Sequence, residues 1–309
     1  LDRRLEELFR TRQARGRPYR KIVLVGHSIG ALIARRAYLY AKGYRSDHPH
    51  PESQQLQPRP DHEQRAWTAA LDRIVLLAGM NRGWDMRKID NRTWIKQIFL
   101  WTGTVLGRTT GTGKLPLGVE RGAPFIGNLR IDWVRMVNRE PDAVRSVVQL
   151  LGEHDDLVTP GDDLDAITAP NFVFIRVDDS GHTNIRDMTT DTPEGRRRSE
   201  LFTEAITHPV DQLKTKYTTN DKLLNKDPSV KHVVFIKHGI RDMADWSTPL
   251  RWELENPSNQ VHVVIEKFPY FSMMSFLLLW DRQSEVRRFV DEYATALARF
   301  PNADRFSSK

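Results

Sequence analysis

The chain has 309 residues, of which 39% are hydrophobic and 28% are charged, and its formal net charge is +7. That length suits one large domain or two smaller ones, with enough apolar residues to fill a sizeable core. Because cysteine is absent, disulfides, thiolate catalysis and zinc–cysteine sites are excluded.

The positive charge is spread along the chain rather than gathered into one binding surface. Its one local excess, from Arg10 to Lys21, has no aromatic stacking pattern, so no nucleic-acid partner is expected. No apolar run approaches the roughly 20 residues that span a bilayer, so no transmembrane segment is expected. The chain begins with Leu1, as a fragment or processed piece would, and shows no signal peptide. The lack of cysteine and of a visible signal peptide favours a location in the cytoplasm.

The first part of the chain alternates helix and strand patterns. Residues 1–15 have the apolar spacing of an amphipathic helix, residues 22–25 predict a buried strand, and residues 31–41 predict a helix. Residues 43–65 are rich in Pro, His, Gln and Asp and predict a solvated loop. The Asp-His pairs in this loop match no metal-ligand spacing, so no metal site is expected.

Three more strands are predicted by short apolar runs at residues 73–78, 146–151 and 171–177, and residues 198–207 predict a helix. Residues 213–231 are rich in Lys, Asn and Thr and are interpreted as a linker.

After this linker the pattern starts again. Residues 232–237 and 261–265 predict strands, and residues 284–299 predict a long amphipathic helix. Short β-branched strands that alternate with helices are typical of the α/β class. The predicted fold is therefore a mostly parallel sheet with helices on both faces.

A Gly-His-Ser-Ile-Gly motif stands where the first strand meets the helix after it. A tight strand-to-helix turn lifts a serine out of the sheet edge and points the helix N-terminus at developing negative charge. Such a turn crowds the backbone, so the residues two before and two after Ser28 must be small, and Gly26 and Gly30 meet this need. The motif predicts a nucleophilic serine, which needs a base and an oxyanion site.

Candidates for the base and for the acid that orients it follow two later strands. Asp155 comes after the strand at residues 146–151, and His182 lies in a turn after the strand at residues 171–177. Ligands of open parallel sheets bind at the carboxyl ends of the strands, where both residues fall. Asp156 is the alternative to Asp155 as the acid. Together, Ser28, Asp155 and His182 predict a catalytic triad.

These motifs carry a family resemblance. The stretch from residue 21 to 207 resembles the α/β-hydrolase superfamily, in particular its lipase/esterase-like branch. The matching residues are GHSIG at 26–30, GEHDDLV at 152–158 and SGH at 180–182. The resemblance implies cleavage of a carboxylic ester without metal or organic cofactor. It assigns the attack to Ser28, proton transfer to His182, its orientation to Asp155 and one oxyanion donor to the N–H of Ile29.

The chain departs from this family's pattern in the order of its parts. Little precedes the serine strand, whereas residues 232–309 resemble the family's opening strands and oxyanion loop. The chain is therefore either a piece of a tandem-hydrolase protein or a permuted fold. We expect residues 1–212 to form the catalytic part and the strands after the linker to complete its sheet. The N–H of Gly239 or Ile240 would then be the second oxyanion donor.

An insertion at residues 84–140 is interpreted as a cap or lid. Its first turns are strongly apolar, and a cleft roofed by such residues favours a hydrophobic or lipid-like ester. The candidate substrate-binding residues are Trp94, Ile98, Phe99 and Trp101.

Two other functions stay open at this point. A catalytically silent fold could act as a binding or interaction module, and a thioesterase or amidase would use the same triad. The sequence does not determine the oligomeric state.

Overall fold

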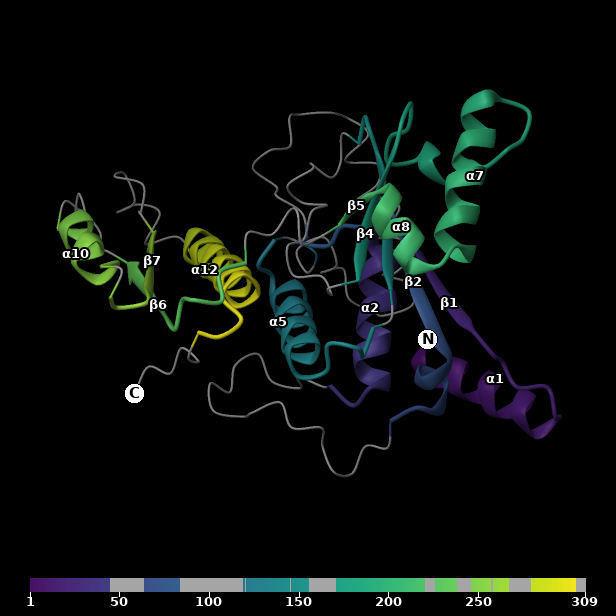
Figure 1. Cartoon of the computed structure of the whole chain (residues 1–309), viewed down its shortest axis with the longest axis horizontal. Helices are drawn as coiled ribbons and strands as arrows, with labels where there is room; N and C mark the ends of the chain where they lie inside the picture. Colours follow the sequence, from purple (N-terminus) through teal and green to yellow (C-terminus); the bar gives the residue numbers. More distant parts are fainter. Residues whose placement is uncertain are drawn as a thin grey trace. The chain divides into compact units, whose positions relative to one another are not determined.

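The computed structural model of the chain is shown in Figure 1. It describes residues 1–44, 64–83, 119, 121–144, 146–155, 171–219, 226–237, 246–256, 258–266 and 279–303. The chain divides into two compact units, residues 1–223 and 224–309, and each unit is described by itself.

The first unit contains a five-stranded sheet whose strands follow one another in sequence order. The strands are β1 (Ile22–His27), β2 (Leu71–Leu77), β3 (Val147–Gly152), β4 (Phe172–Val177) and β5 (Thr218–Thr219). The strands β1 to β4 are parallel, and the short β5 pairs antiparallel with β4. The four predicted strands of this unit are confirmed to within two residues at each end.

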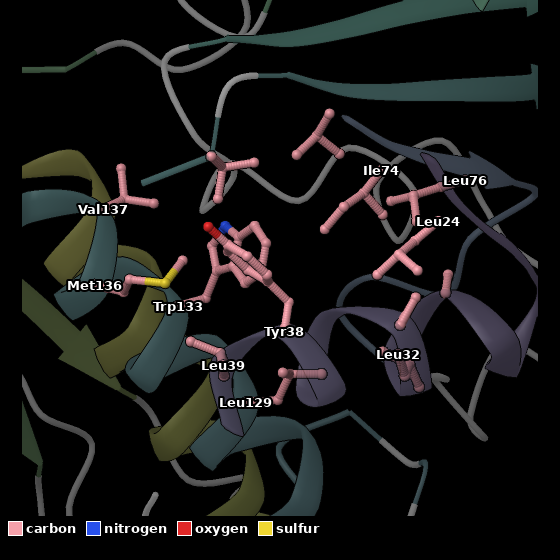
Figure 2. Close-up of a cluster of buried hydrophobic side chains, with 14 of the residues drawn as sticks. Leu24, Leu32, Tyr38, Leu39, Ile74, Leu76, Leu129, Trp133, Met136 and Val137 are labelled. Atoms are coloured by element: carbon pink, nitrogen blue, oxygen red, sulfur yellow. The ribbon is translucent and has the colours of Figure 1, made fainter. Parts of the chain in front are cut away.

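One face of the sheet is covered by α2 (Ile29–Ala41) and α5 (Pro124–Arg139). Alternate strand residues point to the same face, and on this face Leu24, Ile74 and Leu76 pack against the two helices. Figure 2 shows Tyr38 of α2 beside Trp133 of α5, with 6.3 Å between the ring centroids. This cluster is the larger apolar core of the unit.

The other face is covered by α7 (Pro193–Thr207) and α8 (Val210–Lys216). Here the intervening strand residues, such as Val75, Leu150 and Ile175, pack with Leu201 of α7 and Leu213 of α8. The predicted sheet with helices on both faces is therefore confirmed (Figure 1). None of the described helices combines the length and apolar composition needed to cross a bilayer.

The amino-terminal helix α1 (Asp2–Ala14) is tied to the short 3-10 helix η1 (Ala66–Ala70). The backbone N–H of Trp67 donates to Glu6 at 3.4 Å, and its indole N–H donates to Asp2 at 3.3 Å. Trp67 itself is fully buried in the core. Asp2 and Glu6 thus satisfy polar groups of Trp67 that would otherwise be buried without partners.

Helix α5 lies within the predicted lid at residues 84–140, and this part of that prediction is wrong. The helix buries Ile126, Leu129 and Trp133 against α2 and the sheet, so it belongs to the body of the fold. Its apolar residues recur at helical spacing, but Arg130, Asp132 and Arg135 between them make the segment look mixed in sequence. Residues 84–118 of the predicted lid lie outside the described residues.

The predicted linker at residues 213–231 also differs from the structure. Its first residues complete α8 and form β5, and Leu213 is buried in the second core cluster. The sequence did not indicate this helix, because its composition is rich in Lys and Thr and it has only one buried residue, Leu213.

The second unit contains β6 (His232–Lys237) and β7 (Val261–Glu266), which pair in parallel along their whole length. It also contains α10 (Ser247–Leu254) and α12 (Leu279–Arg299), and Phe235 packs on Phe289 of α12 with 5.2 Å between ring centroids.

These two strands pair with each other as a two-stranded sheet, and the expectation that they complete the first sheet stays a prediction. It rested on the cost of leaving β1 unpaired on one side. In the structure β1 is the edge strand of the described sheet, and its Val25 side chain is 49% exposed.

The buried aromatic of α5 gives a test of this core. We expect Trp133→Ala to lower the free energy of unfolding by about 3–5 kcal/mol, because it leaves a cavity between α2, α5 and the sheet. Phe125→Ala in the same helix is the control, since Phe125 is 37% exposed and should cost much less. Urea denaturation followed by circular dichroism measures both, and equal losses would contradict the assignment of α5 to the core.

Candidate active site

Ser28 sits in a strained turn between β1 and α2. Its backbone has φ 55° and ψ −122°, a region that residues other than glycine rarely occupy. Two hydrogen bonds hold it there: its N–H donates to the carbonyl of Leu77 at 3.0 Å, and its carbonyl accepts from the N–H of Ala31 at 3.0 Å. Strain of this kind persists only where the surrounding structure enforces it, and it is common at functional sites.

The two glycines around Ser28 are not equivalent. A Cβ at Gly26 would lie 2.6 Å from the carbonyl carbon and oxygen of Gly30, which is closer than real Cβ atoms approach the backbone. A Cβ at Gly30 would meet no heavy atom of the described chain within 4 Å. The expected need for a small residue is therefore confirmed at position 26, whereas at position 30 the described residues leave room for a side chain.

The structure brings together the three residues that the sequence predicted as a triad. The Oγ of Ser28 lies 2.9 Å from Nε2 of His182, and Nδ1 of His182 lies 3.1 Å from Oδ2 of Asp155. The side chains of His182 and Asp155 are only 8% and 2% exposed. The three residues come from the carboxyl ends of β1, β3 and β4, at one edge of the sheet.

The partners in these hydrogen bonds determine which atoms carry the protons. A carboxylate only accepts, so Nδ1 of His182 carries the proton that is donated to Asp155. Nε2 is then the free acceptor and faces the hydroxyl of Ser28. The arrangement can take the hydroxyl proton as the oxygen attacks an electrophile, and Asp155 can stabilise the imidazolium that forms.

The loops that carry Asp155 and His182 are bound to each other. The N–H of His154 donates to the carbonyl of Ser180 at 2.9 Å, and the N–H of Glu153 donates to the carbonyl of Val177 at 3.0 Å. A Cβ at Gly152 would lie 2.5 Å from that same oxygen of Ser180. Close contact between the two loops therefore needs glycine at this point.

Sequence reasoning missed the residues that shape the His182 loop. Arg198 of α7 donates from Nε to the carbonyl of Asp187 at 2.6 Å and from Nη1 to the hydroxyl of Ser180 at 3.3 Å. The side chain of Asn184 accepts from the N–H of Gly181 at 2.6 Å. Arg198 stands three residues before Leu201 on the buried face of its helix, and that spacing is the signal that could have identified it.

Met80 is a second neighbour of the serine that the sequence did not indicate. Its sulfur lies 3.5 Å from the Oγ of Ser28, and the side chain is 5% exposed. The Met80 turn is held by buried amides, because Asn81 bonds Gln149 of β3, whose Nε2 donates to the carbonyl of Gly79 at 3.5 Å. Met80 therefore places a thioether sulfur, a weak hydrogen-bond acceptor, against the hydroxyl of Ser28.

A buried arginine supports this network from α2. Arg35 donates to the side-chain oxygen of Asn81 at 3.3 Å, and its guanidinium lies 4.7 Å from the ring centroid of Trp133. A cation over an aromatic face recovers part of the cost of burying the charge. Arg35 thereby links the core of α5 to the turn that contacts Ser28.

His27, the residue before the serine, makes a specific contact with the loop of His182. Its Nε2 lies 2.8 Å from the carbonyl oxygen of His182, and the two rings are 5.3 Å apart. Burial lowers the pKa of His27 below its usual 6.5, although the bond to the His182 carbonyl opposes this shift. His27 is therefore a neutral donor at neutral pH.

The predicted oxyanion donor Ile29 is the first residue of α2. The first N–H groups of a helix have no partner within it and lie at its positive end, so this group is suited to an oxyanion. The other predicted site residues lie outside the described residues, as does Asp156. They are Gly239, Ile240, Trp94, Ile98, Phe99 and Trp101.

One group of described side chains has the chemistry of metal ligands. Potential ligand atoms of Glu153, His154 and Asp179 lie within 4.8 Å of one another. All three residues are exposed, and Glu153 already pairs with Arg176. This arrangement is that of a solvated ion-pair cluster.

Comparison with known proteins places these features in context. A family model described as the alpha/beta hydrolase family matches residues 2–196. A thermophilic esterase from Thermogutta terrifontis, solved with malate bound, is similar at 17% identity and a TM-score of 0.28. That match covers 64% of this chain and 66% of the esterase, so the chain spans just under two thirds of the esterase's length. No curated protein matches the chain.

The glycine contacts give the first test of the site. We expect Gly26→Ala to destabilise the protein by about 1–3 kcal/mol, because the new Cβ forces the backbone of Gly30 away and distorts the serine turn. Gly30→Ala is the matched control and should keep the unfolding free energy of wild type or raise it slightly, since alanine favours a helix. Denaturant unfolding measures both, and equal effects would contradict the close approach at residue 26.

The buried position of His27 gives a prediction about pH. Because its pKa is lowered, the unfolded chain takes up a proton at this residue at a higher pH than the folded protein does. His27 therefore contributes a loss of stability as the pH falls through 6.5 toward the lowered folded pKa. An NMR titration of its ring protons, assigned with a His27→Gln variant, should have a midpoint below 6.5, and a midpoint above that value would contradict the burial argument.

Proposed function

The chain belongs to the alpha/beta hydrolase family, and on that premise we propose that it is a serine hydrolase that cleaves a carboxylic ester through an acyl-enzyme. One observation carries the proposal: the continuous hydrogen-bond chain from Ser28 through His182 to Asp155. A serine hydroxyl is a weak nucleophile, and a base in contact with it supplies the activation that ester cleavage needs.

In the proposed mechanism the Oγ of Ser28 attacks the ester carbonyl carbon while its proton passes to Nε2 of His182. The tetrahedral intermediate collapses as His182 returns this proton to the leaving alkoxide oxygen, which releases an alcohol and leaves the acyl group on Ser28. A water molecule then gives a proton to His182 and attacks the acyl carbonyl. Return of that proton to Ser28 releases the carboxylic acid.

The negative charge of the intermediate falls on the former carbonyl oxygen. We assign its stabilisation to the N–H of Ile29, at the positive end of α2. The second donor, from Gly239 or Ile240, stays a prediction from the sequence. A tetrahedral intermediate forms both when the acyl-enzyme is made and when water hydrolyses it, so both steps depend on the oxyanion donors.

A hydrophobic acyl group is the substrate that the sequence favours. This part of the proposal rests on the apolar run that includes Trp94 and Trp101. No metal or organic cofactor takes part in the proposed steps, because the side chains themselves supply nucleophile, base and acid.

Ser28→Ala should abolish labelling by a fluorophosphonate probe, because the probe forms its bond with the activated serine oxygen. Asp155→Asn should lower kcat on p-nitrophenyl esters by about 10⁴, because an amide no longer fixes the tautomer of His182. Mass spectrometry of the labelled peptide and initial-rate kinetics measure the two effects. For wild type, kcat/KM should rise with the length of the acyl chain.

Circular dichroism of the variants is the control for folding. Labelling that persists in folded Ser28→Ala would place the nucleophile elsewhere. A folded wild type that neither reacts with the probe nor turns over any ester would favour the binding-module alternative.

A further inference from the structure

Contact between Ser28 and His182 depends on two segments that are far apart in the sequence. The two residues are separated by 154 positions, and each lies in a turn beyond the end of its strand. A proton moves between their side chains only when the atoms stay at hydrogen-bond distance, and a displacement of about 1 Å can cost about 100-fold in rate. The loop with His182 therefore has to be fixed relative to the Ser28 turn.

His27 makes the contact that can fix it. Nε2 of its ring lies 2.8 Å from the backbone carbonyl of His182. Because a carbonyl oxygen only accepts, Nε2 carries the proton and donates it. His27 is the last residue of β1 and the direct neighbour of Ser28, so this bond joins the backbone of the base to the turn of the nucleophile.

Other hydrogen bonds to the loop of His182 do not connect it to the serine turn. Arg198 ties Asp187 and Ser180 to α7, and Asn184 closes the turn at Gly181 on itself. These contacts give the loop its shape. The bond from His27 instead sets the distance between the loop and the serine.

We infer that His27 is a positioning residue for the proposed reaction: its Nε2–H donates to the carbonyl of His182 and holds that imidazole at Ser28. The inference rests on the proposed function, because positioning has meaning only if His182 acts as the base. His27 touches neither the substrate nor the reacting atoms, and it acts through His182.

The neutral state of His27 suits this task. The charged and titratable groups that influence it are His182, Arg186 and Asp155. When His182 accepts the proton of Ser28, a second positive ring 5.3 Å away would oppose the new charge. A neutral imidazole donates the same hydrogen bond without this repulsion.

The test compares His27→Gln with His27→Asn. The glutamine amide extends about as far as Nε2 of histidine and can keep the donor, whereas the asparagine amide is one carbon shorter and cannot reach the carbonyl. With p-nitrophenyl acetate, we expect His27→Asn to lower kcat about 10- to 100-fold with little change in KM. His27→Gln should recover most of the rate. Fluorophosphonate labelling of Ser28 should slow in the same order.

The melting temperatures of both variants are measured beside the rates, because partial unfolding would lower the concentration of active enzyme, and with it apparent kcat and the extent of labelling, without changing KM. A folded His27→Asn protein that labels and turns over as fast as wild type would overturn the inference and leave the proposed function intact. Equal losses in folded His27→Gln and His27→Asn would also overturn it, since the donor would then be irrelevant. A wild type without labelling or turnover would instead refute the proposed function.

Discussion

The close approach of the backbone at Gly26 to the backbone at Gly30 is the constraint on which the candidate site depends. A Cβ at Gly26 would come within 2.6 Å of the facing carbonyl group, so β1 can turn directly into α2 only with glycine there. This turn pushes Ser28 to a positive φ and lifts its hydroxyl above the sheet edge. The same turn places His27 where its ring reaches the loop of His182.

The parallel sheet brings the other two residues of the candidate site to the edge where this turn lies. Parallel strands end at the same edge of the sheet, so the loops after β3 and β4 lie at the same edge as the turn after β1. Apolar packing on both faces fixes the strands. The buried ion pair of Arg36 and Asp132 adds less than its 2.8 Å distance suggests, because burial raises the pKa of Asp132 despite the arginine.

The surroundings of the serine combine hydrogen-bond donors with low exposure. His182 and Asp155 are almost fully buried, and Met80 covers Ser28 with an apolar side chain. In such a medium each hydrogen bond is stronger than in water, and an unpaired polar group is more costly. The buried amides of Asn81 and Gln149 are accordingly bonded to each other, which keeps the Met80 turn in place.

The sequence by itself determined the strands, the α/β class and the order Ser28, Asp155, His182, because β-branched runs, turn glycines and helical spacing are local signals. Tertiary structure decided that α5 is a core helix, that β6 pairs with β7 and that a Cβ at residue 30 would meet no described atom within 4 Å. It also decided the partners of His27, Met80 and Arg198, which lie in the turn after β1 and the loop after β4. These features depend on contacts between residues far apart in the chain, and no local pattern of residue types encodes such distances.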